Sequence, residues 1–104
     1  MAKKTIGDIK KIVGEIAEQY GAERIYLFGS YARGEEREDS DIDLHVYKGD
    51  IRGFKIGGFY ADLEEKLENK IDLFIGGEEE NKTLYKTTIY SHILSEEILL
   101  YERA

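Results

Sequence analysis

Cysteine and proline are absent from the sequence, and none of its apolar stretches is long. Without cysteine, disulfide bonds and thiolate metal sites are excluded, so any metal must be held by oxygen ligands or by the two histidines. No run approaches the roughly 18 apolar residues that would span a bilayer, and the opening residues, MAKKTIGDIK, lack the apolar segment of a secretory signal. We therefore expect a cytoplasmic protein without a membrane partner.

Positive charge is also scarce, because 22 acidic residues stand against 15 basic ones and give a formal net charge of −7. Non-specific DNA and RNA binding depends on basic side chains that neutralise phosphates, so the sequence argues against DNA as a partner. With 104 residues the chain is in the size range of one domain, and no repeat or low-complexity segment marks a linker. We expect one domain over residues 1–104.

The spacing of apolar residues predicts alternating helices and strands. Three- and four-residue apolar steps predict a helix over residues 4–20, and Gly21 suits its C-terminal end. The other expected elements are a strand at 24–29, a turn or two of helix after it, a strand at 42–47, a loop at 48–58, a helix from Phe59 to about Lys70, a strand at 70–77, a helix within 82–94, and a short strand or an apolar tail at 98–102. This order predicts an α/β or α+β fold in which helices pack on a sheet.

Two aspartates spaced one residue apart are the first candidates for chemistry. Alternation along the expected strand 42–47 places its aliphatic residues on one face and Asp41, Asp43 and His45 on the other. Carboxylates at positions i and i+2 of a strand lie about 6.5–7 Å apart at Cα and repel one another. A divalent cation removes that repulsion, and oxygen ligands favour magnesium or manganese. An isolated Asp-x-Asp pair is more often a solvated structural feature, so the neighbouring residues decide.

Those neighbours favour a phosphate site. Gly29 lets the backbone turn sharply, and Ser30 supplies a hydroxyl and an N–H group at the start of a short helix, where an anion is favoured. The alternative is an ordinary turn with a serine cap. Asp72 points away from the aliphatic face of its own expected strand. If the polar faces coincide, three carboxylates meet beside an anion-binding turn, which fits phosphoryl or nucleotidyl transfer with two metal ions.

The segment GSYARGEEREDSDIDL, residues 29–44, resembles the signature of the DNA polymerase β-like nucleotidyltransferase superfamily. The chain length resembles that of the minimal nucleotidyltransferase (MNT) branch of this superfamily. The resemblance covers nearly the whole chain, because a later strand with an acid at Asp72 also fits the family order. It implies a small mixed β-sheet flanked by helices.

The resemblance also implies a role for each matching residue. Gly29 and Ser30 would hold the nucleotide triphosphate, with ATP as the substrate. Asp41 and Asp43 would bind two Mg²⁺ ions, for which Mn²⁺ is an alternative. Asp72 would complete the metal site and activate the acceptor hydroxyl.

Four further residues of interest lie in the motif or directly after it. Arg33 either neutralises triphosphate charge or pairs with a neighbouring acid. Ser40 is expected to fix the turn into the following strand through its hydroxyl. His45 either lines the pocket or is a satisfied histidine at the rim of the sheet. Tyr31 is notable because it lies inside the motif itself.

The resemblance implies a partner, a small HEPN-domain protein that is often an RNase toxin, with the MNT protein as its antitoxin. In characterised systems of that type the MNT enzyme transfers AMP from ATP to a tyrosine of the toxin. The leading hypothesis is therefore a protein adenylyltransferase. The alternatives are an antitoxin that neutralises its partner by binding alone and a nucleotidyltransferase that acts on a small molecule. Nucleotide preference, homo-oligomerisation and the partner-binding surface stay open.

Overall fold

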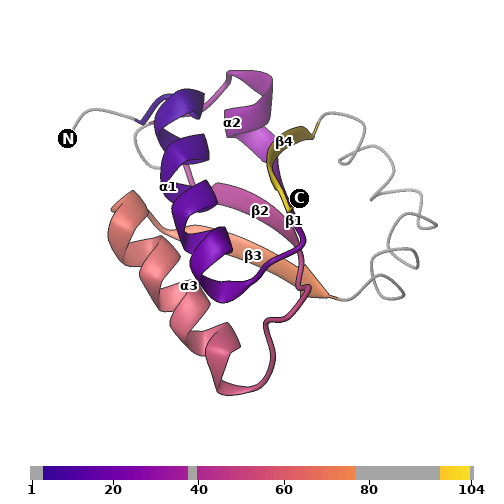
Figure 1. Ribbon diagram of the computed structural model, residues 1–104. Coiled ribbons are helices and arrows are strands. Elements are labelled where there is room, and N and C mark those ends of the chain that lie inside the picture. Colours follow the sequence, from indigo (N-terminus) through magenta and orange to yellow (C-terminus); the bar gives the residue numbers. More distant parts are fainter. Residues whose placement is uncertain (1–3, 38–39, 77–96, 104) are drawn as a thin grey trace.

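The computed structural model describes residues 4–37, 40–76 and 97–103 (Figure 1). These residues form three helices and four strands in the following order: α1 Ile6–Tyr20, β1 Arg24–Phe28, α2 Gly29–Arg33, β2 Ile42–Tyr47, α3 Phe54–Leu67, β3 Ile71–Gly76 and β4 Ile98–Glu102. No helix within these three segments is long and apolar enough to cross a bilayer.

The four strands form one mixed sheet in the order β3-β2-β1-β4. β1 runs antiparallel to both of its neighbours, whereas β2 and β3 are parallel. Parallel neighbours need a crossover connection, and α3 supplies it between β2 and β3. The prediction of an α/β fold with a small mixed sheet flanked by helices is confirmed.

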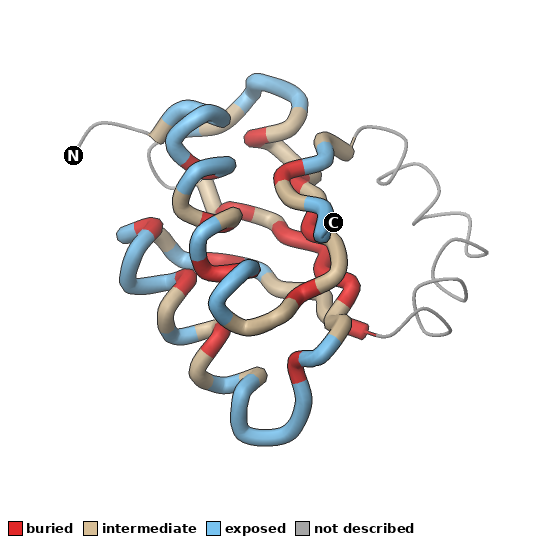
Figure 2. The backbone as a smooth tube through the Cα atoms, in the orientation of Figure 1, coloured by how far each residue is buried: buried red, intermediate tan, exposed pale blue. Residues whose placement is uncertain are grey.

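The core lies between the sheet and the two long helices. α1 and α3 pack side by side on one face of the sheet (Figure 1), and Figure 2 shows buried positions concentrated along the strands and on the helices. The helical residues that are buried lie at helical spacing: Ile9, Val13, Ile16 and Ala17 of α1 and Phe59, Leu63 and Leu67 of α3. Period-2 alternation supplies the opposite wall of the core from Ile25 and Leu27 of β1 and from Ile42, Leu44 and Val46 of β2.

The other face of the sheet carries a group of aromatic rings. The ring of His45 lies 5.2 Å from that of Tyr47 and 6.1 Å from that of Phe74, measured between centroids. Tyr26 of β1 completes the group, with its ring 6.0 Å from Tyr47, and the guanidinium of Arg24 lies 4.5 Å from the centre of the Tyr47 ring. This half of the second face is an aromatic layer, which leaves the other half to the acids.

The start of the second long helix differs from the prediction. A loop was expected at 48–58 and a helix from Phe59 to about Lys70, but α3 spans Phe54–Leu67. The glycines at 57 and 58 interrupt the apolar pattern, yet both lie inside the helix. A β-carbon at Gly58 would come within 3.0 Å of the Tyr20 hydroxyl, so a glycine that weakens the local helix signal permits close packing of α1 on α3.

Near the C-terminus, either a short strand or an apolar tail was expected at residues 98–102. Residues 98–102 are a strand, β4, paired with β1. The helix expected within 82–94 lies outside the described residues.

Phe59 and Phe54 provide a test of this core. Phe59 is fully buried and its ring meets the Tyr20 ring edge-on at 5.5 Å, whereas Phe54 on the same helix is fully exposed. Phe59→Ala should lower the free energy of unfolding by about 3–5 kcal/mol, and Phe54→Ala should change it by less than about 0.5 kcal/mol. Urea unfolding followed by circular dichroism measures both, and equal losses would contradict this placement of α3.

Candidate active site

Strand pairing brings the predicted site residues together. In the parallel pairing of β2 with β3, Asp43 lies directly beside Asp72. In the antiparallel pairing of β1 with β2, Asp43 lies opposite Phe28, which immediately precedes Gly29. Neighbouring strands are about 4.8 Å apart, so three segments that are distant in sequence meet around one carboxylate.

The electrostatics of Asp43 show how closely the acids gather. The pKa of Asp43 is raised to about 6, first by burial and then by the negative charges of Asp72 and Asp41. The positive charge of Arg33 acts in the opposite direction and lowers the pKa. The two other predicted carboxylates and the predicted arginine therefore all lie within electrostatic reach of Asp43.

Gly29 is required by the approach of Asp43 to the backbone. Its φ of +75° lies in the left-handed region, which side chains with a β-carbon rarely adopt. A β-carbon here would overlap Oδ2 of Asp43 and lie 2.9 Å from its Cγ. The turn and the carboxylate are thus in direct contact, and only glycine leaves room for both.

Ser30 is the second residue of α2 and is not the cap of this helix. The N-cap position belongs to Phe28, and no side chain caps the helix, so the alternative of a serine cap is wrong. The first N–H groups of a helix have no acceptor within it. The start of α2 therefore presents backbone donors and the Ser30 hydroxyl next to the acids, a combination that suits the oxygens of a phosphate.

Arg33 makes the predicted pairing with a neighbouring acid, and its role toward a triphosphate stays a prediction. Its Nε donates a hydrogen bond of 3.1 Å to Glu35, and both side chains are exposed. Its charge also lowers the pKa of Asp43, as described above. An exposed guanidinium at the end of α2 can reach an anion that binds at the start of the helix, because α2 has only five residues.

Two further polar residues, Ser40 in the motif and His45 directly after it, differ in outcome. The Ser40 hydroxyl accepts a hydrogen bond of 2.8 Å from the Arg37 N–H group, and the Ser40 N–H group donates to the Arg37 carbonyl at 3.0 Å. Its predicted role in the turn into β2 is confirmed. His45 is only 1% exposed on an inner strand, with Nδ1 3.8 Å from the Glu97 carboxylate, so it lies within the aromatic layer and not at the rim.

Sequence reasoning missed the proximity of Tyr60. Tyr60 was not among the predicted site residues, and its hydroxyl donates a hydrogen bond of 3.3 Å to the Ile71 carbonyl. Partial burial and Glu64 raise the pKa of this tyrosine, and the charges of Asp72 and Asp41 add to the rise. Its place beside the acids depends on how α3 crosses the sheet, for which the sequence carries no signal.

The predicted carboxylates are the kind of ligand that magnesium prefers, but they are not already arranged around a metal position. Among the described residues, no three His, Cys, Asp or Glu side chains are grouped so as to hold one metal ion. Magnesium usually takes only one or two protein carboxylates and keeps water and substrate phosphates as its other ligands. Burial and then the charges of Asp72 and Asp41 raise the pKa of Asp43, and a bound cation would relieve the repulsion between these charges. Asp41 and Asp43, with Asp72 beside them, are therefore suitable ligands.

Known proteins with similar sequences are nucleotidyl-transferring enzymes by name. Residues 10–104 match the family described as polymerase beta, nucleotidyltransferase. A Methanocaldococcus jannaschii protein, provisionally named a protein adenylyltransferase, is 40% identical over 78 residues, which are 67% of this chain and 87% of the relative. The protein adenylyltransferase MntA of Thermococcus cleftensis is 38% identical over 77 residues, which are 70% of this chain and 75% of that protein.

Solved structures share the fold. One that is provisionally described as a minimal nucleotidyltransferase aligns with a TM-score of 0.68 at 28% identity and covers 94% of this chain and 98% of that chain. A chain from the complex of the tri-AMPylated Shewanella oneidensis HEPN toxin with its MNT antitoxin aligns with a TM-score of 0.56 at 20% identity. That alignment covers 92% of this chain and 71% of the other.

Gly29 and Gly34 have similar backbone angles but different surroundings. Substitutions at the two positions therefore distinguish the cost of a steric clash from the cost of a strained backbone. Gly29 and Gly34 have φ values of +75° and +72°, but nothing lies within 4 Å of a β-carbon at Gly34. Gly34→Ala should cost about 1–2 kcal/mol of folding free energy for the left-handed backbone alone. Gly29→Ala should cost more, because the methyl group also displaces Asp43. Urea unfolding measures both losses, and equal values would rule out the close approach.

The burial of Asp43 and the negative charges beside it predict that the fold loses stability as the pH rises, which is the opposite of the usual effect of an aspartate. The pKa of Asp43 is about 6 in the folded protein against an ordinary value of 3.8, so ionisation destabilises the fold as pH rises through this window. In chelator, Asp43→Asn should melt at a higher temperature than wild type above pH 7, with the difference shrinking toward pH 4.

A second aspartate serves as the control of opposite sign. Hydrogen bonds from the Thr5 backbone and side chain lower the pKa of Asp8, so its charge stabilises the fold above the ordinary pKa of aspartate, and that stability is lost as pH falls. Asp8→Asn should therefore lower the melting temperature at pH 7. Thermal scans across pH measure both variants, and a destabilised Asp43→Asn at pH 7.5 would contradict the crowding.

Proposed function

Because the chain belongs to the polymerase beta nucleotidyltransferase family, we propose that it transfers AMP from ATP to a hydroxyl of a HEPN-domain toxin and thereby acts as the antitoxin. The observation that carries the proposal is the gathering of Asp41, Asp43 and Asp72 beside the Gly29 turn. A relative is named protein adenylyltransferase MntA, and a structure of the same fold comes from a complex with an AMPylated HEPN toxin. Both support this choice of reaction and partner.

The start of α2 binds the triphosphate in this proposal. Backbone N–H groups and the Ser30 hydroxyl donate hydrogen bonds to phosphate oxygens, and the helix start favours negative charge. Arg33, at the other end of the same short helix, offsets the remaining charge of the phosphates. These groups hold the α-phosphorus next to the carboxylates, because Gly29 is in contact with Asp43.

Asp41 and Asp43 would hold two magnesium ions. When bound, such ions neutralise phosphate charge and stabilise the entering and leaving oxygens. Without a cation the ionised carboxylates would repel the triphosphate, because both carry negative charge. ATP and a divalent cation therefore bind together in this site, and neither is expected to bind well alone.

Asp72 serves the acceptor. It is exposed on β3, directly beside Asp43, where an incoming side chain can reach it. Asp72 takes the proton of the acceptor hydroxyl as general base, and the oxygen bonds to the α-phosphorus of ATP. The bond to the β-phosphate breaks, and pyrophosphate leaves. A tyrosine of the toxin is the proposed acceptor, and modification in the cytoplasm is the proposed setting.

Intact-mass spectrometry tests the reaction directly. The HEPN protein encoded beside this chain, incubated with it, ATP and magnesium, should gain the mass of one or more AMP groups, and peptide mapping should place them on tyrosine. Asp43→Asn or a chelator should abolish the gain, because the cation and the triphosphate are no longer held at the same place.

Asp50→Asn is the matched control for that experiment. Asp50 is an exposed acid paired with Arg103 at 3.0 Å and takes no part in the site. The same change of carboxylate to amide at this position should leave the mass gain intact. An unchanged toxin mass in a stable complex would instead identify an antitoxin that acts by binding alone.

A further inference from the structure

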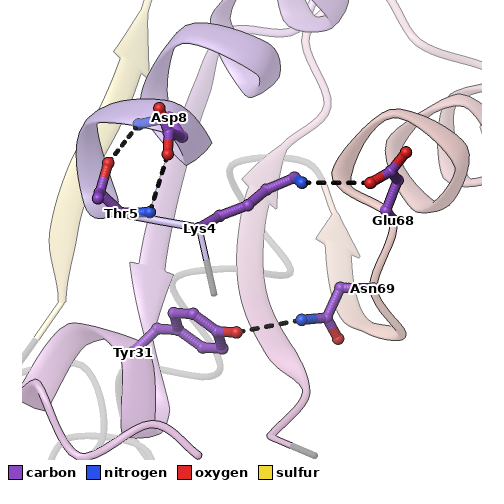
Figure 3. A network of polar contacts seen from close by, with 6 residues as sticks. All are labelled: Lys4, Thr5, Asp8, Tyr31, Glu68 and Asn69. Atoms are coloured by element: carbon purple, nitrogen blue, oxygen red, sulfur yellow. Dashed lines mark hydrogen bonds and ion pairs between the residues drawn. The ribbon is translucent and has the colours of Figure 1, made fainter. Parts of the chain in front are cut away.

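A tyrosine inside the glycine-serine motif is joined to the segment that carries the third acid. Asn69 donates a hydrogen bond of 3.1 Å from Nδ2 to the Tyr31 hydroxyl, across 38 residues of sequence (Figure 3). Tyr31 directly follows Ser30 on α2, and its side chain is only 2% exposed. Asn69 lies between the end of α3 and the start of β3, three residues before Asp72.

We propose that Tyr31 and Asn69 are a positioning pair that fixes the triphosphate turn relative to Asp72. The proposal rests on the function proposed above, because the value of a fixed distance lies in aligning the nucleotide with the group that activates the acceptor. Neither residue touches the reacting atoms, and both act through the elements to which they belong.

The backbone conformation just before Asn69 helps to place its side chain near Tyr31. Glu68 is the only non-glycine residue of the described segments with a positive φ, +51°, and it ends α3 in the left-handed conformation. Asparagine tolerates this conformation better than glutamate does, yet Asn69 does not occupy it. The left-handed position thus falls on Glu68, one residue before the asparagine, where it is unfavourable for a side chain with a β-carbon, and the Asn69 side chain meets Tyr31.

Glu68 is itself held from the other side. Its carboxylate lies 3.8 Å from Nζ of Lys4, just ahead of α1 (Figure 3). Directly after Asn69, the Lys70 carbonyl accepts a hydrogen bond of 3.0 Å from the Ile42 N–H group, which starts the pairing of β2 with β3. The connection from α3 to β3 is thereby tied to α2 by a side chain and to β2 by the backbone, and these two elements carry Ser30 and Asp43.

A purely structural role makes a different prediction from a positioning role. A hydrogen bond that only stabilises the fold would lower the melting temperature and leave catalysis unchanged in the folded fraction. A positioning bond would lower kcat, because a displacement of about 1 Å between reacting groups can cost on the order of 100-fold. The KM for ATP would change little, since Gly29 and Ser30 stay in place.

The test uses Tyr31→Phe, Asn69→Ala and the double variant, with Tyr20→Phe as the matched control. Tyr20 also donates a hydroxyl hydrogen bond, of 2.6 Å, to Asp62, and it joins α1 to α3 away from the acids. All variants are assayed for AMP transfer to the toxin well below their melting temperatures. Tyr31→Phe should lower kcat by about 10-fold or more with KM for ATP within about twofold, and Tyr20→Phe should leave kcat unchanged.

The double variant should have the kcat of the single variants, because both remove the same bond. Multiplied losses in the double variant, an unchanged kcat in Tyr31→Phe, or an equal loss in Tyr20→Phe would each overturn the proposal.

A second measurement separates failure of this proposal from failure of the proposed function. Magnesium-ATP bound at the turn should slow hydrogen exchange of the β3 amides in wild type and Tyr20→Phe, but not in Tyr31→Phe. If wild type fails to modify the toxin but keeps this pattern, the toxin reaction is wrong and the positioning pair stands. If bound nucleotide does not protect β3 in wild type, the pair is overturned.

Discussion

The parallel pairing of β2 with β3 is the constraint on which the site depends. It sets Asp43 beside Asp72, although two carboxylates at that spacing repel one another. The opposite sides of the same strands carry Ile42, Leu44 and Ile71, which are buried under the helices. A slip of β3 by one residue would turn Asp72 into that core, so apolar burial on one face fixes the register of the acids on the other.

The alternation of apolar and polar residues predicted which face of each strand is buried, because successive side chains of a strand point to opposite faces. It predicted that Asp43 and Asp72 face away from the core, but the choice of β2 and β3 as neighbours came from the family resemblance and the fold. The start of α3 was not predictable from periodicity, since Gly57 and Gly58 break the pattern. Gly58 is favoured by the approach of Tyr20, a contact made across the fold.

Long-range side-chain contacts were the least predictable part of the site. Tyr31 attracted notice only because it lies within the motif, and nothing local indicates Asn69 as its donor. Tyr60 shares a helix with core residues, and its hydroxyl reaches β3 because of the way α3 crosses the sheet. Propensity and periodicity describe which side of an element is buried, whereas these contacts depend on the distances between elements.

The grouped acids lower the stability of the fold, yet the proposed function requires them. The fold holds negative charge at Asp43 against burial and against two neighbouring carboxylates, with Arg33 as the opposing charge that lowers its pKa. ATP adds more negative charge, and the chain as a whole already carries −7. Helix amides and one exposed guanidinium are modest compensation for a triphosphate. In the proposed mechanism a cation held by Asp41 and Asp43 would offset the negative charge of the nucleotide, and the repulsion among the carboxylates would favour its binding.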